Sequence, residues 1–197
     1  FGAGGCPPAR IEKAIAAIQE ALPDGPYAFN LLNSPADPAL EARAVELYLT
    51  HRITALEASA YIRLTAPLVR YRAAGLSRLP DGSARIGNRV IAKISRREVA
   101  AQFLSPAPDE ILNALHEQGE ITSDQAAMAR TLPMADDITV EADSGGHTDN
   151  RPMVGLIPSL LTLRDELQQK YQFDTPVRIG AAGGIATPHA ALAAFLM

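Results

Sequence analysis

The sequence predicts an α/β fold built on a parallel sheet. Short apolar runs, typical of buried strands, alternate along the chain with longer segments whose apolar residues recur at helical spacing. This alternation implies parallel pairing of the strands through right-handed crossovers. The expected strands lie at residues 27–32, 54–58, 89–95, 138–142 and 177–182.

The helices are expected from apolar periodicity. In the first helix, at 10–22, the isoleucines follow one another at steps of four and three and form a single stripe. The other helices are expected after residue 37, at 97–104, 109–118 and 123–132, around 156–167 and after residue 187. Segment 68–94 is less regular, and besides the strand at 89–95 it shows only a tight Asp-Gly turn at 81–82 between two extended arms.

Several predicted helices also carry start signals. Asp37 and Thr187 each precede a proline, which is typical of an N-cap residue followed by proline in the first helical turn. Thr122 with Gln125 three residues later fits a capping box.

Two α/β architectures fit five strands in this order. One is an open, doubly wound sheet, and the other is a (β/α)₈ barrel. A barrel typically takes about 250 residues, so the 197 residues would form an incomplete one. No linker divides the chain and no internal repeat is visible, so residues 1–197 are expected to form a single domain.

Composition argues against several classes of function. Hydrophobic residues make up 47% of the chain, enough for a core, but no apolar run approaches the length of a membrane span. A net charge of −4 argues against general binding to nucleic acid or to an anionic membrane. The single cysteine excludes an internal disulfide and a multi-thiolate metal site, no other metal-ligand set is convincing, and a reducing, cytoplasmic setting is expected.

The first candidate site is the glycine-rich turn at 180–185, between a predicted strand and a predicted helix. Gly183 and Gly184 let the backbone approach an anion closely, and the N–H groups at a helix start favour phosphate. The dinucleotide fingerprint G-x-G-x-x-G is absent. The alternative is a turn that needs glycine only for its positive φ angles, and the residues alone favour neither interpretation.

The second candidate site is the polar loop at 143–152, which follows a strand and is therefore expected at the carboxyl-end face of the sheet. His147 is suited to proton transfer near neutral pH, and Gly145 and Gly146 leave room for another molecule. The alternative, slightly favoured by the residues alone, is a surface turn whose Asp and Asn side chains bond their own backbone.

Two polar residues interrupt apolar strands. Lys93 is costly to bury unpaired, so it either meets an anion or holds its head in water at the end of the strand. Asn30 is a lone amide that needs partners, which neighbouring backbone or a ligand can supply. Lys93 also belongs to a basic cluster with Arg96 and Arg97, which indicates a solvated face or a contact to a ligand phosphate.

The loop and the last turn together resemble a known family. EADSGGHTDNRP at 141–152 and RIGAAGGIATPHAALAAF at 178–195 are similar to the flavin-dependent enoyl reductases of bacterial polyunsaturated fatty acid and trans-acyltransferase polyketide synthases, within the nitronate monooxygenase-like family. Similarity at 1–5, 68–76 and 91–108 extends the resemblance over nearly the whole chain. The GGH core is shared by the wider family, whereas the TDNRP continuation is typical of the reductase branch.

This resemblance implies a (β/α)₈ barrel that binds FMN without a covalent bond. The first strand or strands and the last strand of that barrel would lie outside the 197 residues. His147 matches the active-site histidine, which would protonate the substrate or orient its thioester oxygen. A cation beside the flavin ring of FMN would stabilise the negative charge of the reduced flavin. The residues implied to bind FMN are Asn30, Lys93, Gly145, Gly146, Gly183 and Gly184.

The implied reaction is reduction of the α,β-double bond of an enoyl thioester carried by an acyl carrier protein, with hydride from NADPH or NADH passing through the flavin. A polyketide or fatty acid synthase would be the partner. The alternatives are a nitronate monooxygenase, a barrel that only binds a phosphate ligand, and a non-catalytic barrel that docks a synthase. Arg151 is expected to pair with Asp149 or Asp143 rather than with a phosphate.

Overall fold

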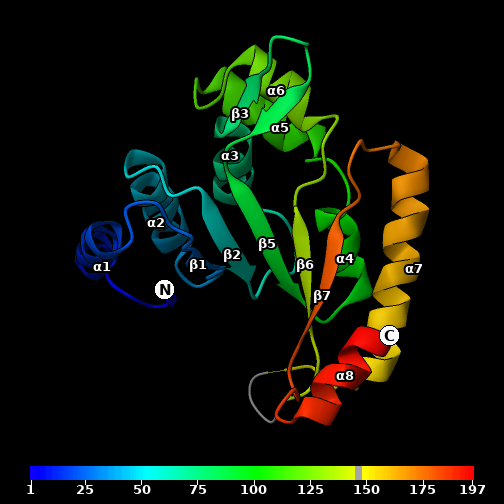
Figure 1. The fold of residues 1–197 in the computed structure, drawn as a ribbon. Helices are drawn as coiled ribbons and strands as arrows, with labels where there is room; N and C mark the ends of the chain where they lie inside the picture. The colour runs from blue at the N-terminus through cyan, green and yellow to red at the C-terminus, as the bar shows by residue number, and fades with distance from the viewer. Residues whose placement is uncertain (145–147) are drawn as a thin grey trace.

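The computed structural model describes residues 1–144 and 148–197, and its centre is a five-stranded parallel sheet (Figure 1). The strands lie side by side in chain order, β1-β2-β5-β6-β7, and each neighbouring pair is parallel, as the sequence predicts. Their bounds are β1 Phe29–Leu32, β2 Ala55–Ser59, β5 Arg89–Ile94, β6 Asp137–Glu141 and β7 Arg178–Ala182.

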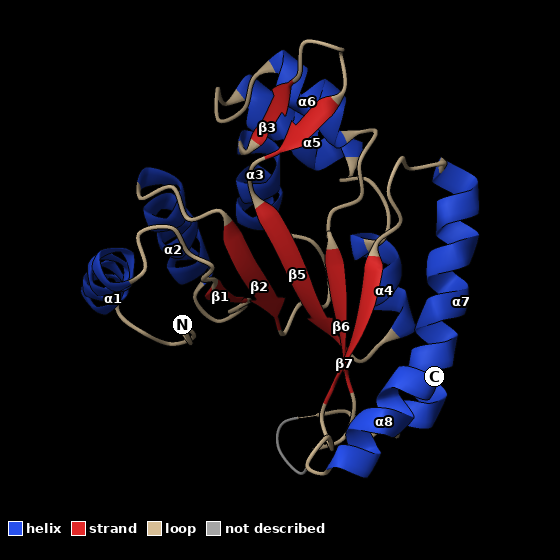
Figure 2. Ribbon diagram, in the orientation of Figure 1, coloured by secondary structure: helices blue, strands red, loops and turns tan. Residues whose placement is uncertain are grey.

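Eight helices and an antiparallel hairpin complete the described part of the chain (Figure 2). The hairpin and the neighbouring α5 and α6 lie beyond the amino ends of the sheet strands, whereas α8 lies beyond the carboxyl end of β7. The bounds are α1 Pro8–Ala21, α2 Pro38–Thr50, α3 Ala66–Ala74, β3 Leu76–Arg78, β4 Ala84–Ile86, α4 Arg97–Phe103, α5 Asp109–Glu117, α6 Ser123–Ala129, α7 Met153–Tyr171 and α8 Pro188–Leu196.

The sheet has one helix-covered face and one open face. Right-handed crossovers between strands that follow one another in chain order place the connecting helices on the same side. In Figure 2, β2, β5 and β6 are seen with no helix in front of them. Side chains that alternate along the strands reach the helices and are almost fully buried, each contributing roughly 1.5–3 kcal/mol when it is a large aliphatic residue. They include Leu31, Leu56, Val90, Ile138 and Val140.

This arrangement excludes the doubly wound alternative for the described residues. A doubly wound sheet reverses its strand order and carries helices on both faces. Here the order does not reverse, and the intervening strand residues, such as Asn30, Lys93 and Thr139, are only partly buried. The described fold is thus an α/β sheet wound in one direction, with a polar face left open.

The expected strands and most of the helices are confirmed within about two residues, whereas α6 ends three residues earlier than expected and α7 extends beyond the expected range at both ends. Asp37 is confirmed as an N-cap by position only, because its side chain makes no capping hydrogen bond, and one element was missed. Thr122 and Gln125 form the predicted capping box, and the Asp-Gly turn joins β3 to β4. Helix α3 was not predicted, because buried side chains cover most of its circumference and no polar face marks its period. No helix in the described ranges is long and apolar enough to cross a membrane.

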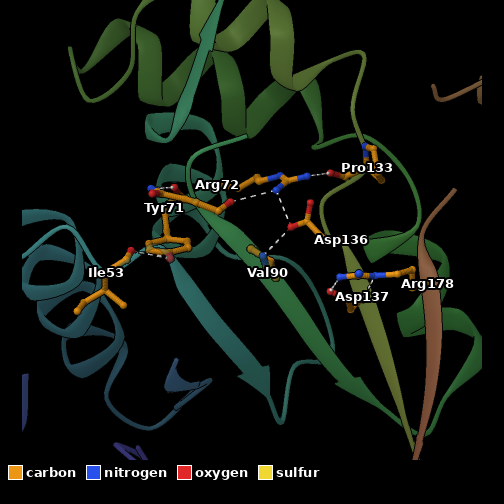
Figure 3. A network of polar contacts seen from close by, with 9 residues as sticks. Ile53, Tyr71, Arg72, Val90, Pro133, Asp136, Asp137 and Arg178 are labelled. Carbon is orange, nitrogen blue, oxygen red and sulfur yellow. Dashed lines mark hydrogen bonds and ion pairs between the residues drawn. The ribbon is translucent and has the colours of Figure 1, made fainter. Parts of the chain in front are cut away.

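A buried ion pair joins α3 to the amino ends of the central strands (Figure 3). The Arg72 side chain is only 2% exposed, and it donates to Asp136 at 2.8 Å and to the backbone carbonyls of Asn88 and Pro133 at 3.0 Å. Asp136 also accepts from the backbone N–H of Val90 at 2.8 Å. Burial lowers the pKa of Arg72, and Asp136 opposes that shift. The hydrogen bonds of the pair connect α3 to the chain where β5 and β6 begin.

Candidate functional site

The open face of the sheet brings Asn30 and Lys93 onto one surface. The Asn30 amide donates to the hydroxyl of Ser59 at 2.6 Å and to the carboxylate and carbonyl oxygens of Glu57, each at 3.3 Å. Asn30 and Glu57 are register partners on adjacent strands. Of the two alternatives for Asn30, the partners in the structure come from the neighbouring strand, and they hold the amide in a defined orientation.

Lys93 meets an anion, and that anion belongs to the protein. Its Nζ lies 3.2 Å from Glu141 Oε1, one strand away, and both side chains are partly exposed. Lys93 is the register partner of Thr139, and Thr139 is that of Gly180. A Cβ at Gly180 would meet nothing closer than the Ile138 carbonyl oxygen at 3.9 Å, so the sheet has free space over Gly180, two strands from the lysine.

Two depressions meet at Lys93. The first, the open-face hollow, has a volume of about 490 Å³ and is lined by Phe1, Gly2, Ala28, Phe29, Asn30, Leu32, Glu57, Ser59 and Lys93. The second, the carboxyl-end cleft, lies where β2, β5 and β6 end and has a volume of about 370 Å³. It is lined by Ala60, Tyr61, Ile62, Lys93, Ile94, Ser95, Arg96, Val99, Glu141, Thr148 and Asp149. Cavities of this size suit small-molecule ligands.

The predicted residues Gly145, Gly146 and His147 lie outside the described residues, but the loop is described on both sides of them. After them, Asp149 accepts from Arg96 Nε and a terminal nitrogen at 2.9 and 2.8 Å, and it also accepts from the Ser95 hydroxyl. These hydrogen bonds, Arg96 first, hold the pKa of Asp149 well below its usual range. The loop is therefore anchored to the end of β5.

This contact corrects the expected pairing of Arg151 with Asp149. The cation that binds Asp149 is Arg96, from the neighbouring strand end, and the backbone carbonyl of Arg151 accepts from the Asp143 N–H at 2.9 Å. Of the two interpretations of the basic cluster, the structure favours the solvated face. Lys93, Arg96 and Arg97 are partly exposed, and each binds a different acid, the last one Glu166 at 2.7 Å.

The turn after β7 uses its glycines for backbone geometry. Gly183 and Gly184 have φ angles of 89° and 70°, and a Cβ at Gly183 would lie 2.3 Å from the Ala142 carbonyl oxygen. Glycine is thus required where the turn passes the end of β6. Thr187 caps α8 by accepting from the backbone N–H of Ala190 at 3.2 Å.

Several site residues were not found from the sequence. Glu57, Ser59 and Glu141 lie at the ends of predicted strands, where alternation places them on the same face as Lys93. Alternation along the strands could have indicated the face on which these side chains lie. Only the strand register shows which of them are neighbours. Gly180 is part of the glycine-rich turn predicted at 180–185. Its pairing with Thr139 shows that it also lies on the open face of the sheet. In the described ranges, no group of acidic, histidine or cysteine side chains has the arrangement of a metal site.

Comparison with known proteins finds relatives that are much longer than this chain. All of its residues align with a component of the polyunsaturated fatty acid synthase of Thraustochytrium sp. at 53% identity and with polyketide biosynthesis protein PksE of Bacillus subtilis at 48% identity. The chain spans only 13% and 26% of these two relatives. No family model matches.

A solved structure has the same fold. The enoyl reductase domain of MlnA, from the macrolactin biosynthesis cluster of Bacillus amyloliquefaciens, is 40% identical and superposes with a TM-score of 0.94. The match covers all of this chain and 44% of that one.

Proposed function

Because the chain is homologous over its whole length to a segment of polyketide and polyunsaturated fatty acid synthase proteins and to a solved enoyl reductase domain, we propose that it belongs to an FMN-dependent enoyl reductase. The substrate would be an α,β-unsaturated thioester on an acyl carrier protein, and the hydride donor NADPH or NADH. The observation that carries this proposal is the open polar face around Lys93 and Asn30.

The open face supports a (β/α)₈ barrel for the intact protein. Parallel sheets are normally covered on both faces, and here half of each strand's side chains have no helix over them. A barrel interior would cover them without reversing the strand order. The chain would then supply five consecutive strands, and the remaining strands, including the first and the last, would come from elsewhere in the protein.

The residues present fit FMN. The open-face hollow combines a cation, an oriented amide and a hydroxyl, and the same face has free space over Gly180 two strands away, which suits a planar polar ring. Lys93 and Asn30 would hold the ring, and the turn at Gly183 and Gly184, which precedes the start of α8, would receive the phosphate. FMN, when bound, would supply hydride transfer between the nicotinamide and the double bond.

The protein's own residues would orient the reactants and deliver the proton. Lys93 would neutralise charge beside the pyrimidine side of the ring, and Glu141 would hold the ammonium group in place. Gly145 and Gly146 would let the ring approach the loop. His147 would protonate the α-carbon or orient the thioester oxygen. Asp149 would fix the loop that carries His147 by its bonds to Arg96 and Ser95.

The test is turnover by the intact protein reconstituted with FMN. NADPH-dependent conversion of crotonyl-pantetheine to butyryl-pantetheine, followed by mass spectrometry, is the expected result. His147→Ala should retain FMN and lose most of this turnover, roughly 10²-fold or more for a general acid. Oxygen uptake that depends on an added nitronate, without thioester reduction, would favour the monooxygenase instead. Failure to bind FMN would favour the docking scaffold.

A further inference from the structure

The carboxyl-end cleft adjoins the open-face hollow, and Lys93 lines both. Building on the proposed function, we propose that the carboxyl-end cleft receives the acyl-thioester arm of the substrate, and that Ile62 is the apolar residue on its rim that contacts the acyl chain and sets chain-length preference.

The shared lysine gives the two depressions a functional relation. Hydride transfer requires that the donor and acceptor atoms touch, at roughly 3–3.5 Å. A ring held in the open-face hollow and an arm held in the carboxyl-end cleft would meet over the Lys93 side chain.

The charges of the carboxyl-end cleft are already neutralised within the protein. Lys93 is paired with Glu141, and Arg96 is paired with Asp149. The lining also includes apolar side chains, among them Ile62 and Val99. A cleft that combines paired charges with apolar groups suits an uncharged arm with amide groups and an alkyl end, rather than an anion.

The rim that carries Ile62 is fixed from both sides. Before it, the Tyr61 hydroxyl donates to Glu41 at 2.8 Å, and the Glu41 side chain also accepts from Asn33 at 3.0 Å and from Thr65. Glu41 is only 3% exposed. Burial, and then Glu41, raise the pKa of Tyr61, so its hydroxyl keeps the proton that it donates.

Gln102 of α4 fixes the other side of the rim. Its amide donates to the Ile62 carbonyl at 3.0 Å, and its side-chain oxygen accepts from the Leu64 N–H at 3.2 Å. At the start of the rim, Ala60 has a φ angle of 61°, an uncommon conformation for alanine. In contrast to this held backbone, the Ile62 side chain is 67% exposed and is not needed for the core. A rigid backbone that presents one apolar side chain is preorganised for contact with a ligand.

The experiment compares Ile62→Ala and Ile62→Glu with Leu79→Ala in the intact protein. Leu79 is an exposed leucine, 40% accessible, in the turn between β3 and β4, and it serves as the matched control. Calorimetry with butyryl-pantetheine measures binding to the cleft without turnover. Steady-state kinetics with crotonyl- and trans-2-decenoyl-pantetheine measure chain-length preference.

Ile62→Ala is expected to raise the dissociation constant of butyryl-pantetheine and the KM of both thioesters about tenfold, with a larger effect for the decenoyl chain. The KM for NADPH and the FMN content should not change, and Leu79→Ala should behave like the wild type. Thioester binding and KM within twofold of the wild type in both Ile62 variants would overturn the inference. If the wild type binds no FMN, the proposed function fails. Calorimetry then still tests whether the carboxyl-end cleft binds the thioester. Loss of butyryl-pantetheine binding in Ile62→Glu supports binding at the cleft, and binding equal to that of the wild type contradicts it.

Discussion

Asp136 and Asp137 are neighbours in the chain, yet their arginine partners come from different elements and differ in burial. Asp136 binds Arg72 of α3, whose side chain is almost fully buried, whereas Asp137 binds Arg178 of β7, which is 70% exposed. Figure 3 shows both pairs around the start of β6. The same chemistry therefore has different consequences for stability, because only the buried pair is shielded from water.

Arg72→Met is expected to lower the free energy of unfolding by about 3 kcal/mol or more, since it leaves Asp136 largely buried without its cation. Arg178→Met should lower it by less than about 1 kcal/mol, the usual value of an exposed pair. Urea unfolding of both variants measures the difference. Equal losses in the two variants would contradict the assigned roles.

Asp149 links stability to pH. Its pKa in the folded protein is held below the ordinary value near 4 by Arg96 and Ser95. The stabilisation is therefore fully present above about pH 4, and it is lost as the pH falls below that value toward the folded pKa. In urea unfolding between pH 3 and pH 6, Asp149→Asn should reduce the loss of stability at the acidic end. Arg96→Gln should have the same effect, and a wild-type slope in both variants would contradict the assignment.

At the scale of single elements, Gly180 of β7 and Gly183 of the turn after it have different roles. Gly183 combines a φ angle of 89° with a close approach to the backbone of Ala142, so an added Cβ forces the turn to move. Gly180 has open space where its Cβ would stand. Gly183 is thus required by the fold, and Gly180 is available for a ligand.

Gly183→Ala should lower the free energy of unfolding by about 2 kcal/mol or more, because strain and a backbone contact both oppose it. Gly180→Ala should leave stability within about 1 kcal/mol of the wild type. Thermal unfolding of the two variants is the measurement. A Gly183→Ala protein as stable as Gly180→Ala would show that the turn is not constrained as described.

The elements differ in how far the sequence predicted them. The strands and the Thr122 capping box follow from local patterns, and the structure confirms them. Helix α3 was missed because its burial comes from tertiary packing, including the buried Arg72. Lys93 was identified as a site residue, but its partner Glu141 lies 48 positions along the chain, and only the pairing of β5 with β6 brings the two together.

At the scale of the whole molecule, the central feature is a sheet wound in one direction with a polar face left open. The strand order explains why the helices gather on one side, and the side chains of the other side explain why a planar, polar ligand would bind there. The relatives are longer proteins, of which the chain spans 13% and 26%.

Lys93 is expected to contribute to FMN binding at the open face. Lys93→Ala should weaken FMN binding by the intact protein about tenfold or more, since it leaves Glu141 without its cation beside the ring. Lys93→Arg, which keeps the charge, should restore part of this loss. Quenching of FMN fluorescence measures the dissociation constant, and equal values for all three proteins would remove Lys93 from the binding site.

The most direct test of the central claim is the absorbance spectrum of the intact protein under anaerobic conditions. The open face is expected to hold oxidised FMN, whose visible band should bleach when NADPH is added and return when crotonyl-pantetheine follows. A protein that takes up no FMN, or whose reduced flavin is not reoxidised by the thioester, would contradict the account.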